Sequence, residues 1–174
     1  PRLGGHVSDV AGLAVRVAAE LGLPADETDR VRSAAQLHDV GKLAIPDAIL
    51  DKPGPLDEAE WAFMHRHTIV GERILLAAPA LAPVAPLVRS SHERWDGGGY
   101  PDGIAGEGIP LGARIIAVCD AWDSMISDRP YRAAIGFDDA LAEIEDNAGT
   151  QFDPVVAAAL RAVVARAESR AVAA

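Results

Sequence analysis

Apolar residues recur at helical spacing over most of the chain. Residues 6–21 follow the pattern of an amphipathic helix, and a Gly-Leu-Pro sequence then favours its end. Asp26 can cap a second helix that runs to about Asp39, where Gly41 interrupts the regular pattern. The first forty or so residues therefore predict two successive helices, with the Gly41-Lys42 pair at the end of the second.

The remainder predicts further helices around one glycine-rich segment. A Pro-Gly-Pro loop at residues 53–55 precedes a helix that begins at Asp57 and has a break before Ile69. Residues 94–108 contain six glycines and a proline, which exclude a regular helix and predict a functional loop. Further helices are expected over residues 81–92, over residues 110–127 with Pro110 in the first turn and Pro130 after the end, over residues 138–147, and over residues 153–168 with Asp153 as the cap. There is no internal repeat or strand pair, so the expectation is an all-α fold.

The length and composition fit one helical domain. A chain of 174 residues suits a single core, so residues 1–174 are expected to form one domain. Hydrophobic residues make up 49% of the chain and aromatic residues only 5%, which favours helices packed through small side chains. No apolar run reaches the roughly 20 residues that span a bilayer, and the N-terminal segment does not resemble a signal peptide. We therefore expect a cytoplasmic protein without membrane insertion, and its one cysteine, Cys119, excludes an internal disulfide framework.

The charge balance narrows the range of partners. The chain has 16 Lys and Arg against 26 Asp and Glu, which gives a net charge of −10. This charge disfavours a nucleic acid polymer or an anionic lipid surface as a partner, so a phosphate-containing substrate must be bound by a few local basic residues. Because the chain begins at Pro1 without an initiator Met, we expect a fragment of a longer signalling protein with an upstream sensor or receiver domain.

A set of His and Asp residues suggests metal chemistry. His38 and Asp39 are neighbours, which is unusual for two ligands on a regular helix because adjacent side chains point about 100° apart, but a helix end relaxes this constraint. An imidazole and a bridging carboxylate suit divalent metals. Four more candidate ligands fall on four different predicted helices and could converge in the centre of a bundle: His6, His67, His92 and Asp120. Asp123 shares a helix face with Asp120 and could orient substrate or water. From spacing alone, the alternative that these are ordinary core or surface residues stays open.

Two long strings carry a family resemblance. The first is His38-Asp39-Val40-Gly41-Lys42 with Ile45-Pro46-Asp47, and the second is His92-Glu93-Arg94-Trp95-Asp96-Gly97-Gly98-Gly99-Tyr100-Pro101-Asp102-Gly103. Further matches are Ile109-Pro110-Leu111, Asp120, Asp123 and Arg129-Pro130-Tyr131-Arg132. Together these motifs resemble the HD-GYP branch of the HD phosphohydrolase superfamily. The resemblance implies an HD-domain helical bundle of about seven helices with a Gly-rich GYP loop, and hydrolysis of cyclic di-GMP to linear pGpG or onward to GMP.

The resemblance also implies a role for each matching residue. Asp39 would bridge two divalent metal ions, iron or manganese by resemblance, and would act in catalysis with Lys42, which would contact phosphate. Substrate would be bound by Tyr100, Asp123, Arg129 and Arg132, and the two guanidinium groups suit this role because they hold phosphate oxygens bidentately. The implied metal ligands are His6, His38, Asp39, His67, His92 and Asp120. The metals would activate water and stabilise the in-line transition state.

Two positions depart from the family pattern. The family usually has two consecutive histidines before the Glu of its H-H-E motif, whereas this chain has Ser91-His92-Glu93. A serine hydroxyl is a poorer ligand than imidazole for such metals, so the second metal site is expected to be weaker, or to be completed by water or Glu93. Some members carry a Glu four residues before the position of His6, and Arg2 stands there, so no third metal is expected.

Three functions remain open at this stage. The first is a cyclic di-GMP phosphodiesterase, whose expected partners are an upstream sensor or receiver domain, diguanylate cyclase (GGDEF) proteins and a second copy of the chain. The second is a catalytically weak or inactive domain that binds metal and a cyclic dinucleotide, because of Ser91. The third is a phosphohydrolase for another nucleotide, since fold and metal do not determine the substrate.

The tryptophans, His65 and Cys119 are expected to have mainly structural roles. The three tryptophans are expected in the core, and Trp95 is the best candidate for stacking on guanine. His65 cannot point in the same direction as His67 on one regular helix, so it is expected at the surface or behind the ligands. Cys119 should pack as a small apolar side chain.

Overall fold

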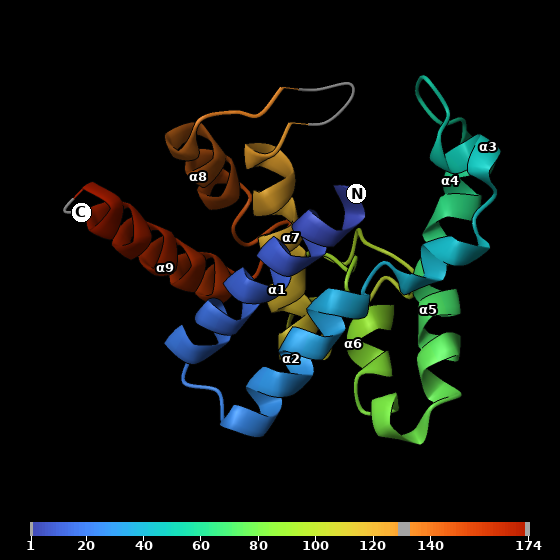
Figure 1. Cartoon of the computed structure of the whole chain (residues 1–174), viewed down its shortest axis with the longest axis horizontal. Helices are drawn as coiled ribbons and strands as arrows, with labels where there is room; N and C mark the ends of the chain where they lie inside the picture. The colour runs from blue at the N-terminus through green and yellow to red at the C-terminus, as the bar shows by residue number, and fades with distance from the viewer. Residues whose placement is uncertain (1, 129–132, 173–174) are drawn as a thin grey trace.

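Helix α7, Leu111–Ile126, is the element around which the other long helices pack (Figure 1). The computed structural model describes residues 2–128 and 133–172, and the side chains of residues 10–128 and 133–167. The helices in contact with α7 include α1 (Arg2–Glu20), α2 (Ala25–Leu37), α8 (Phe137–Asp146) and α9 (Pro154–Val172). Most residues of α7 are buried, as expected for a helix that is apolar around most of its circumference, so α7 forms the centre of the core.

A second group of helices extends from this core on the side away from α8 and α9 (Figure 1). Helix α5 (His67–Leu76) packs against α6 (Ala85–Arg89) and against η1 (Val40–Ala44), a 3₁₀ turn that follows α2. Helices α3 (Asp47–Leu50) and α4 (Glu58–His65) project beyond α5. The end of α2 and the start of α5 therefore lie where the two groups of helices meet.

Gly41 allows η1 and α5 to approach closely. A Cβ atom at this position would lie 1.8 Å from the carbonyl oxygen of His67 and 2.6 Å from the amide nitrogen of Gly71. Both distances are far shorter than van der Waals contact and both involve backbone atoms, so a larger residue would force the two elements apart. The close approach brings the turn that carries Asp39 against the first turn of α5.

The all-α prediction is confirmed. The part of the chain that the structure describes contains seven α-helices of eight or more residues and two shorter ones, and no strand apart from an isolated bridge. Asp57 begins α4 with a capping box, in which each of Asp57 and Glu60 accepts a hydrogen bond from the other's amide. Asp153 accepts from the amide of Val155 at the start of α9, as its predicted role as a cap requires. None of the described helices combines the length and the apolar character needed to cross a membrane.

One predicted helix cap is wrong, and one predicted helix break is confirmed but lies earlier in the chain than expected. The N-cap of α2 is Pro24, and Asp26 lies in the first turn, where it pairs with Arg30 instead of capping the helix. The break predicted before Ile69 falls earlier, at Arg66, which follows the last residue of α4 and precedes the first residue of α5.

The helix predicted for residues 81–92 is much shorter than expected. A 3₁₀ turn, η2 (Pro79–Leu81), comes first, and α6 then begins just before Pro86, whose ring fits only in a first helical turn. The Ser91 hydroxyl donates to the carbonyl of Val88 just beyond the end of α6, a local bond that competes with continuation of a helix. His92 therefore lies in a turn after α6. The prediction that His92 lies on a helix is wrong.

The tryptophans differ in burial. Trp122 lies in the core together with Cys119, as predicted. Trp95 is half-buried, with the guanidinium carbon of Arg114 5.6 Å from its ring centroid. The core prediction is wrong for Trp61, which is 48% exposed because it lies on α4, beyond the main body of helices.

Candidate metal centre

His38 and Asp39 lie at the junction of α2 and η1. His38 is the C-cap residue of α2 and Asp39 precedes the first residue of η1, so the chain changes direction between them. His38 Nε2 lies 3.7 Å from Asp39 Oδ2 and 3.8 Å from Oδ1 of Asp120 in α7. Lys42, in η1, donates to Asp39 Oδ2 at 2.7 Å. The helix end thus directs the side chains of two sequence neighbours to one place.

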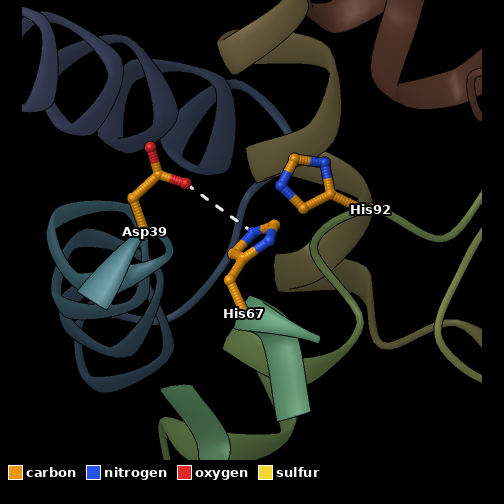
Figure 2. Close-up of side chains that lie close together, drawn as sticks. All are labelled: Asp39, His67 and His92. Carbon is orange, nitrogen blue, oxygen red and sulfur yellow. Dashed lines mark ion pairs between the residues drawn. The ribbon is translucent and has the colours of Figure 1, made fainter. Parts of the chain in front are cut away.

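His67 and His92 reach the same place from two other segments (Figure 2). His67 is the first residue of α5, and its Nε2 lies 3.7 Å from Asp39 Oδ1. The centroid of the His92 ring lies 5.0 Å from that of His67 and 6.5 Å from that of His38. One potential ligand atom from each of Asp39, His67 and His92 lies within 4.8 Å of the others. The structure therefore brings together the predicted ligands His38, Asp39, His67, His92 and Asp120.

Backbone hydrogen bonds orient two of the imidazoles. Nδ1 of His38 lies 2.7 Å from the carbonyl oxygen of Ala35, and Nδ1 of His67 lies 2.7 Å from the carbonyl oxygen of Met64. Because a carbonyl oxygen only accepts, Nδ1 carries a proton in both rings, and Nε2 is the nitrogen that faces the centre. Metal-bound histidines commonly donate their other ring N–H to a carbonyl in this way.

Several polar atoms at the centre are buried without a hydrogen-bond partner. Among the described residues, these atoms are Asp39 Oδ1, His67 Nε2 and His92 Nε2, and Glu93 Oε2, on the residue after His92, is a fourth atom of this kind. An unsatisfied buried polar atom costs about 1–3 kcal/mol, so proteins seldom gather several in one place without a ligand to satisfy them. Imidazole nitrogens and carboxylate oxygens are the donors that borderline divalent metals accept. The residues present therefore fit a divalent metal ion.

Burial sets the protonation states of the centre. Burial lowers the pKa of His92 to about 4, and the neighbouring His67 imidazole adds to this effect. Burial also lowers the pKa of His67. Burial alone would raise the pKa of Asp39, but His38 and Lys42 outweigh it and hold that pKa below its usual value. At neutral pH, His67 and His92 are neutral and Asp39 is ionised, which are the states that bind metal.

Helix α7 contributes two carboxylates one turn apart. Asp120 is partly exposed and its Oδ1 lies near His38 Nε2, whereas Asp123 is buried, with 4% exposure. Both lie on α7, as the sequence predicted. A role for Asp120 as a metal ligand, and for Asp123 in substrate binding, stays a prediction.

Tyr100 is held between two imidazole rings. It stacks on His65 with centroids 3.8 Å apart and an interplanar angle of 12°, and on His92 with centroids 5.1 Å apart and an angle of 11°. Burial, with a further contribution from Asp39 and Asp120, raises the pKa of the phenol, so the hydroxyl keeps its proton. With an imidazole against each face of the ring, the hydroxyl is the part of Tyr100 that can serve the predicted substrate binding. The sequence places His65 at the surface or behind the ligands, and nothing in it indicates this stack.

Ion pairs hold the glycine-rich loop, residues 94–108, beside the centre. Arg89, the last residue of α6, forms two parallel bonds of 2.7 Å to the carboxylate of Asp102, through Nε and Nη2. Its Nη1 donates to Glu72 of α5 at 2.6 Å. The amide of Asp102 donates to Glu93 Oε1 at 2.7 Å. Arg89 and Glu72 were not predictable from the sequence, because ion pairs between distant elements leave no periodic signal in a chain.

Ser91, which stands where the resemblance predicts a histidine, is buried, and its hydroxyl is used within the backbone. Its hydroxyl donates to the carbonyl of Val88 at 2.9 Å. The nearby Glu93 is also buried, and its Oε2 has no hydrogen-bond partner. Completion of the second metal site by Glu93 or by water stays a prediction.

For three of the predicted site residues the structure describes no side chain. His6 falls within α1, but its side chain is not among the described ones. Arg129 and Arg132 belong to the segment 129–132, which lies outside the described residues. Their roles as a metal ligand and as phosphate-binding groups therefore stay predictions.

Comparison with known proteins identifies relatives of this domain. A family model described as HD domain matches residues 1–156. The chain is 47% identical over 151 residues to the cyclic di-GMP phosphodiesterase response regulator RpfG of Xanthomonas campestris pv. campestris, a match that covers 86% of this chain and 39% of that protein. It is 43% identical over 163 residues to 3'3'-cGAMP-specific phosphodiesterase 3 of Vibrio cholerae, with coverage of 92% and 35%. The chain thus spans well under half the length of these relatives.

Two solved structures share the fold. A cyclic GMP-AMP specific phosphodiesterase of V. cholerae has a TM-score of 0.72 at 19% identity, covering 91% of this chain and 43% of that chain. An HDG"Y"P protein from Bdellovibrio bacteriovorus has a TM-score of 0.73 at 18% identity, with coverage of 93% and 52%. At such identities the two structures establish the helical fold alone. The family match over residues 1–156 shows that the chain belongs to the HD domain family, as its HD-GYP motifs predicted.

Proposed function

We propose that this domain is a metal-dependent phosphodiesterase that hydrolyses cyclic di-GMP to linear pGpG, to GMP, or to both. One observation carries the proposal: Asp39, His67 and His92 converge, and each holds a buried polar atom without a hydrogen-bond partner. Relatives named as cyclic di-GMP phosphodiesterases, at 47% identity in X. campestris and 41% in Thermotoga maritima, support the substrate class.

The proposed cofactor is a pair of divalent cations, iron or manganese, that share Asp39. The two oxygens of Asp39 face different histidines, Oδ2 toward His38 and Oδ1 toward His67, each at 3.7 Å. A carboxylate that would bridge two cations needs one oxygen toward each. Oδ1 has no hydrogen-bond partner, and Oδ2 would become available once Lys42 turns away from it. When bound, the cations supply Lewis acidity and activate water near neutral pH.

The chain's own side chains would position the substrate. The ammonium group of Lys42, now 2.7 Å from Asp39 Oδ2, can turn to a phosphate oxygen when substrate binds. The Tyr100 hydroxyl, which keeps its proton, can donate to a second oxygen of the reacting group. Arg129 and Arg132 are proposed to hold the other phosphate. In the reaction a water oxygen bonds to phosphorus, the bond from phosphorus to the ribose oxygen breaks, and that oxygen takes up a proton.

Two other functions have specific support. The 43% identity to a 3'3'-cGAMP-specific phosphodiesterase favours a mixed cyclic dinucleotide as the substrate. A weak or inactive binding domain is favoured by Ser91, because its hydroxyl is used on the carbonyl of Val88 and one family imidazole is missing. These alternatives differ from the main proposal in product and in rate.

Product analysis distinguishes the three functions. Purified protein of measured metal content would be incubated with cyclic di-GMP, 3'3'-cGAMP or cyclic di-AMP, with and without added manganese or iron(II). The main proposal predicts that cyclic di-GMP is consumed fastest and that pGpG or GMP accumulates. Intact cyclic di-GMP after incubation with metal-loaded protein would contradict it, and faster loss of 3'3'-cGAMP would support the mixed substrate. Binding without turnover would support the signalling domain.

A further inference from the structure

A row of aromatic rings leads from the metal centre to the surface of α4. His92 stacks on Tyr100, and Tyr100 stacks on His65 with centroids 3.8 Å apart. The row continues to Trp61, one turn earlier on α4, whose centroid lies 5.6 Å from that of His65 at an interplanar angle of 47°. Each ring thus contacts the next, and Trp61 is the outermost member.

Trp61 is distinctive because it is both exposed and connected to this row. It is 48% exposed, whereas Trp122 is 3% exposed in the core. A single exposed aromatic residue is common on protein surfaces and would mean little alone. Phe63 on the same helix provides the comparison, since it is 41% exposed but contacts the guanidinium of Arg66, 5.0 Å from its ring centroid. The contact with His65 is therefore what distinguishes Trp61.

We propose that Trp61, supported by His65, forms a stacking subsite for a purine base of a nucleotide whose phosphate lies at the metal centre. The inference deepens the proposed function and rests on it. A base can stack only on a ring face that is accessible, and both faces of Tyr100 are covered by His65 and His92. Trp61 is the next ring outward and is the one with a large exposed surface. Base stacking on aromatic side chains is a general means of holding nucleotides.

The metal centre and the stacking subsite would bind different parts of one ligand, the phosphate and the base. The carboxylate and imidazole groups of the centre would hold cations. These cations and Lys42 would attract phosphate but would not distinguish one base from another. Trp61 offers a flat apolar surface that favours large purine rings over smaller pyrimidine rings. The subsite would therefore contribute to affinity and to the choice of nucleotide, and not to the chemical step.

The test compares Trp61→Ala with Trp61→Phe and with the matched control Phe63→Ala. Trp61→Ala should raise KM for cyclic di-GMP roughly 10- to 100-fold and leave kcat within about twofold, whereas Trp61→Phe should recover most of the affinity. Phe63→Ala, which removes another exposed ring from the same helix, should change KM by less than about twofold. Thermal unfolding and metal content of each variant would establish that fold and centre are intact.

Tryptophan fluorescence gives a readout that does not depend on turnover. Titration of the parent protein with cyclic di-GMP should quench its emission, and Trp61→Phe should lose most of that quenching. Absence of quenching in the parent, or an unchanged KM in a folded Trp61→Ala protein that still hydrolyses cyclic di-GMP, would overturn the subsite while leaving the phosphodiesterase proposal standing. Trp61-dependent quenching without hydrolysis would support the subsite and contradict the phosphodiesterase.

Discussion

The metal centre and the glycine-rich loop beside it differ in whether their polar groups have hydrogen-bond partners within the protein. In the centre, Asp39, His67 and His92 each leave a buried polar atom without a hydrogen-bond partner. In the loop, Asp102 receives two bonds of 2.7 Å from Arg89, whose third guanidinium nitrogen donates to a carboxylate of α5. The carboxylate of Asp102 is satisfied within the protein, so this ion pair holds the loop in its conformation. In the centre, the unsatisfied polar atoms lower the free energy of unfolding, but they remain available to bind a ligand.

The largest effect is expected from removing the carboxylate that the centre shares. Asp39→Ala should lose nearly all bound metal and lower hydrolysis more than about 100-fold, since even the outer partners of metal ligands are worth 10- to 100-fold. Metal analysis and product formation measure the two effects. Asp47→Ala, which removes an exposed carboxylate from α3, is the control and should match the parent. A folded Asp39→Ala protein with the parent's metal content would contradict the assignment.

The close approach of η1 and α5 provides the next test. Gly41→Ala should reduce the free energy of unfolding by about 3 kcal/mol and reduce metal content, because its Cβ would overlap the His67 carbonyl oxygen. Gly12→Ala is the control, since Gly12 lies within α1 and a Cβ there meets no atom within 4 Å. That change should stabilise the protein by up to about 1 kcal/mol. Equal urea midpoints for the Gly41→Ala variant and the parent would show that the two elements separate without cost.

Removing the ion pairs of the glycine-rich loop should make the loop less ordered and should leave the metal content unchanged. Arg89→Gln breaks the bonds to Asp102 and Glu72, so it should cost about 1–2 kcal/mol of unfolding free energy and speed hydrogen exchange of the loop amides. Metal content should stay at the parental level. Arg30→Gln breaks an exposed pair with Asp26 and should cost less than about 0.5 kcal/mol. Loss of metal from the Arg89→Gln variant would mean that loop and centre are not separable in function.

The smallest expected effect concerns the missing imidazole. Ser91→His should raise metal content and raise turnover by a few-fold, up to about 10-fold, most clearly at limiting manganese. Ser91→Ala, which removes the hydroxyl without adding a ligand, should show no such increase. If Ser91→His binds no more metal than Ser91→Ala across a manganese titration, the second site is already complete in the natural sequence.

Local signals in the sequence were sufficient for much of the fold but not for the contacts that shape the centre. The caps at Asp57 and Asp153 were predictable because a cap acts within a few residues of itself. The stack of His65 on Tyr100 was not, because it joins α4 to a loop far along the chain. Exposure of Trp61 was missed for the same reason: burial depends on which helices pack against α4, and periodicity alone does not contain that information.

Convergence of the ligands shows the same limit. The helix end after His38 was predictable from Gly41, and so was the direction change that lets Asp39 join it. The placement of His92 in a turn was not, because it depends on where α6 ends. The family resemblance indicated which residues would meet, while spacing alone left ordinary core residues as an equal alternative.

The helix break at Arg66 separates the metal centre from α4, the helix that projects from the protein. Helix α4 ends at His65 and α5 begins at His67, so two histidines separated by one residue belong to different helices. His67 lies against Asp39, while His65 supports the ring behind His92. A tilt of α4 about this joint would shift one imidazole relative to the other. Because α4 projects from the body of the molecule, a displacement of this helix would reach the His92 imidazole through the stacked rings of His65 and Tyr100.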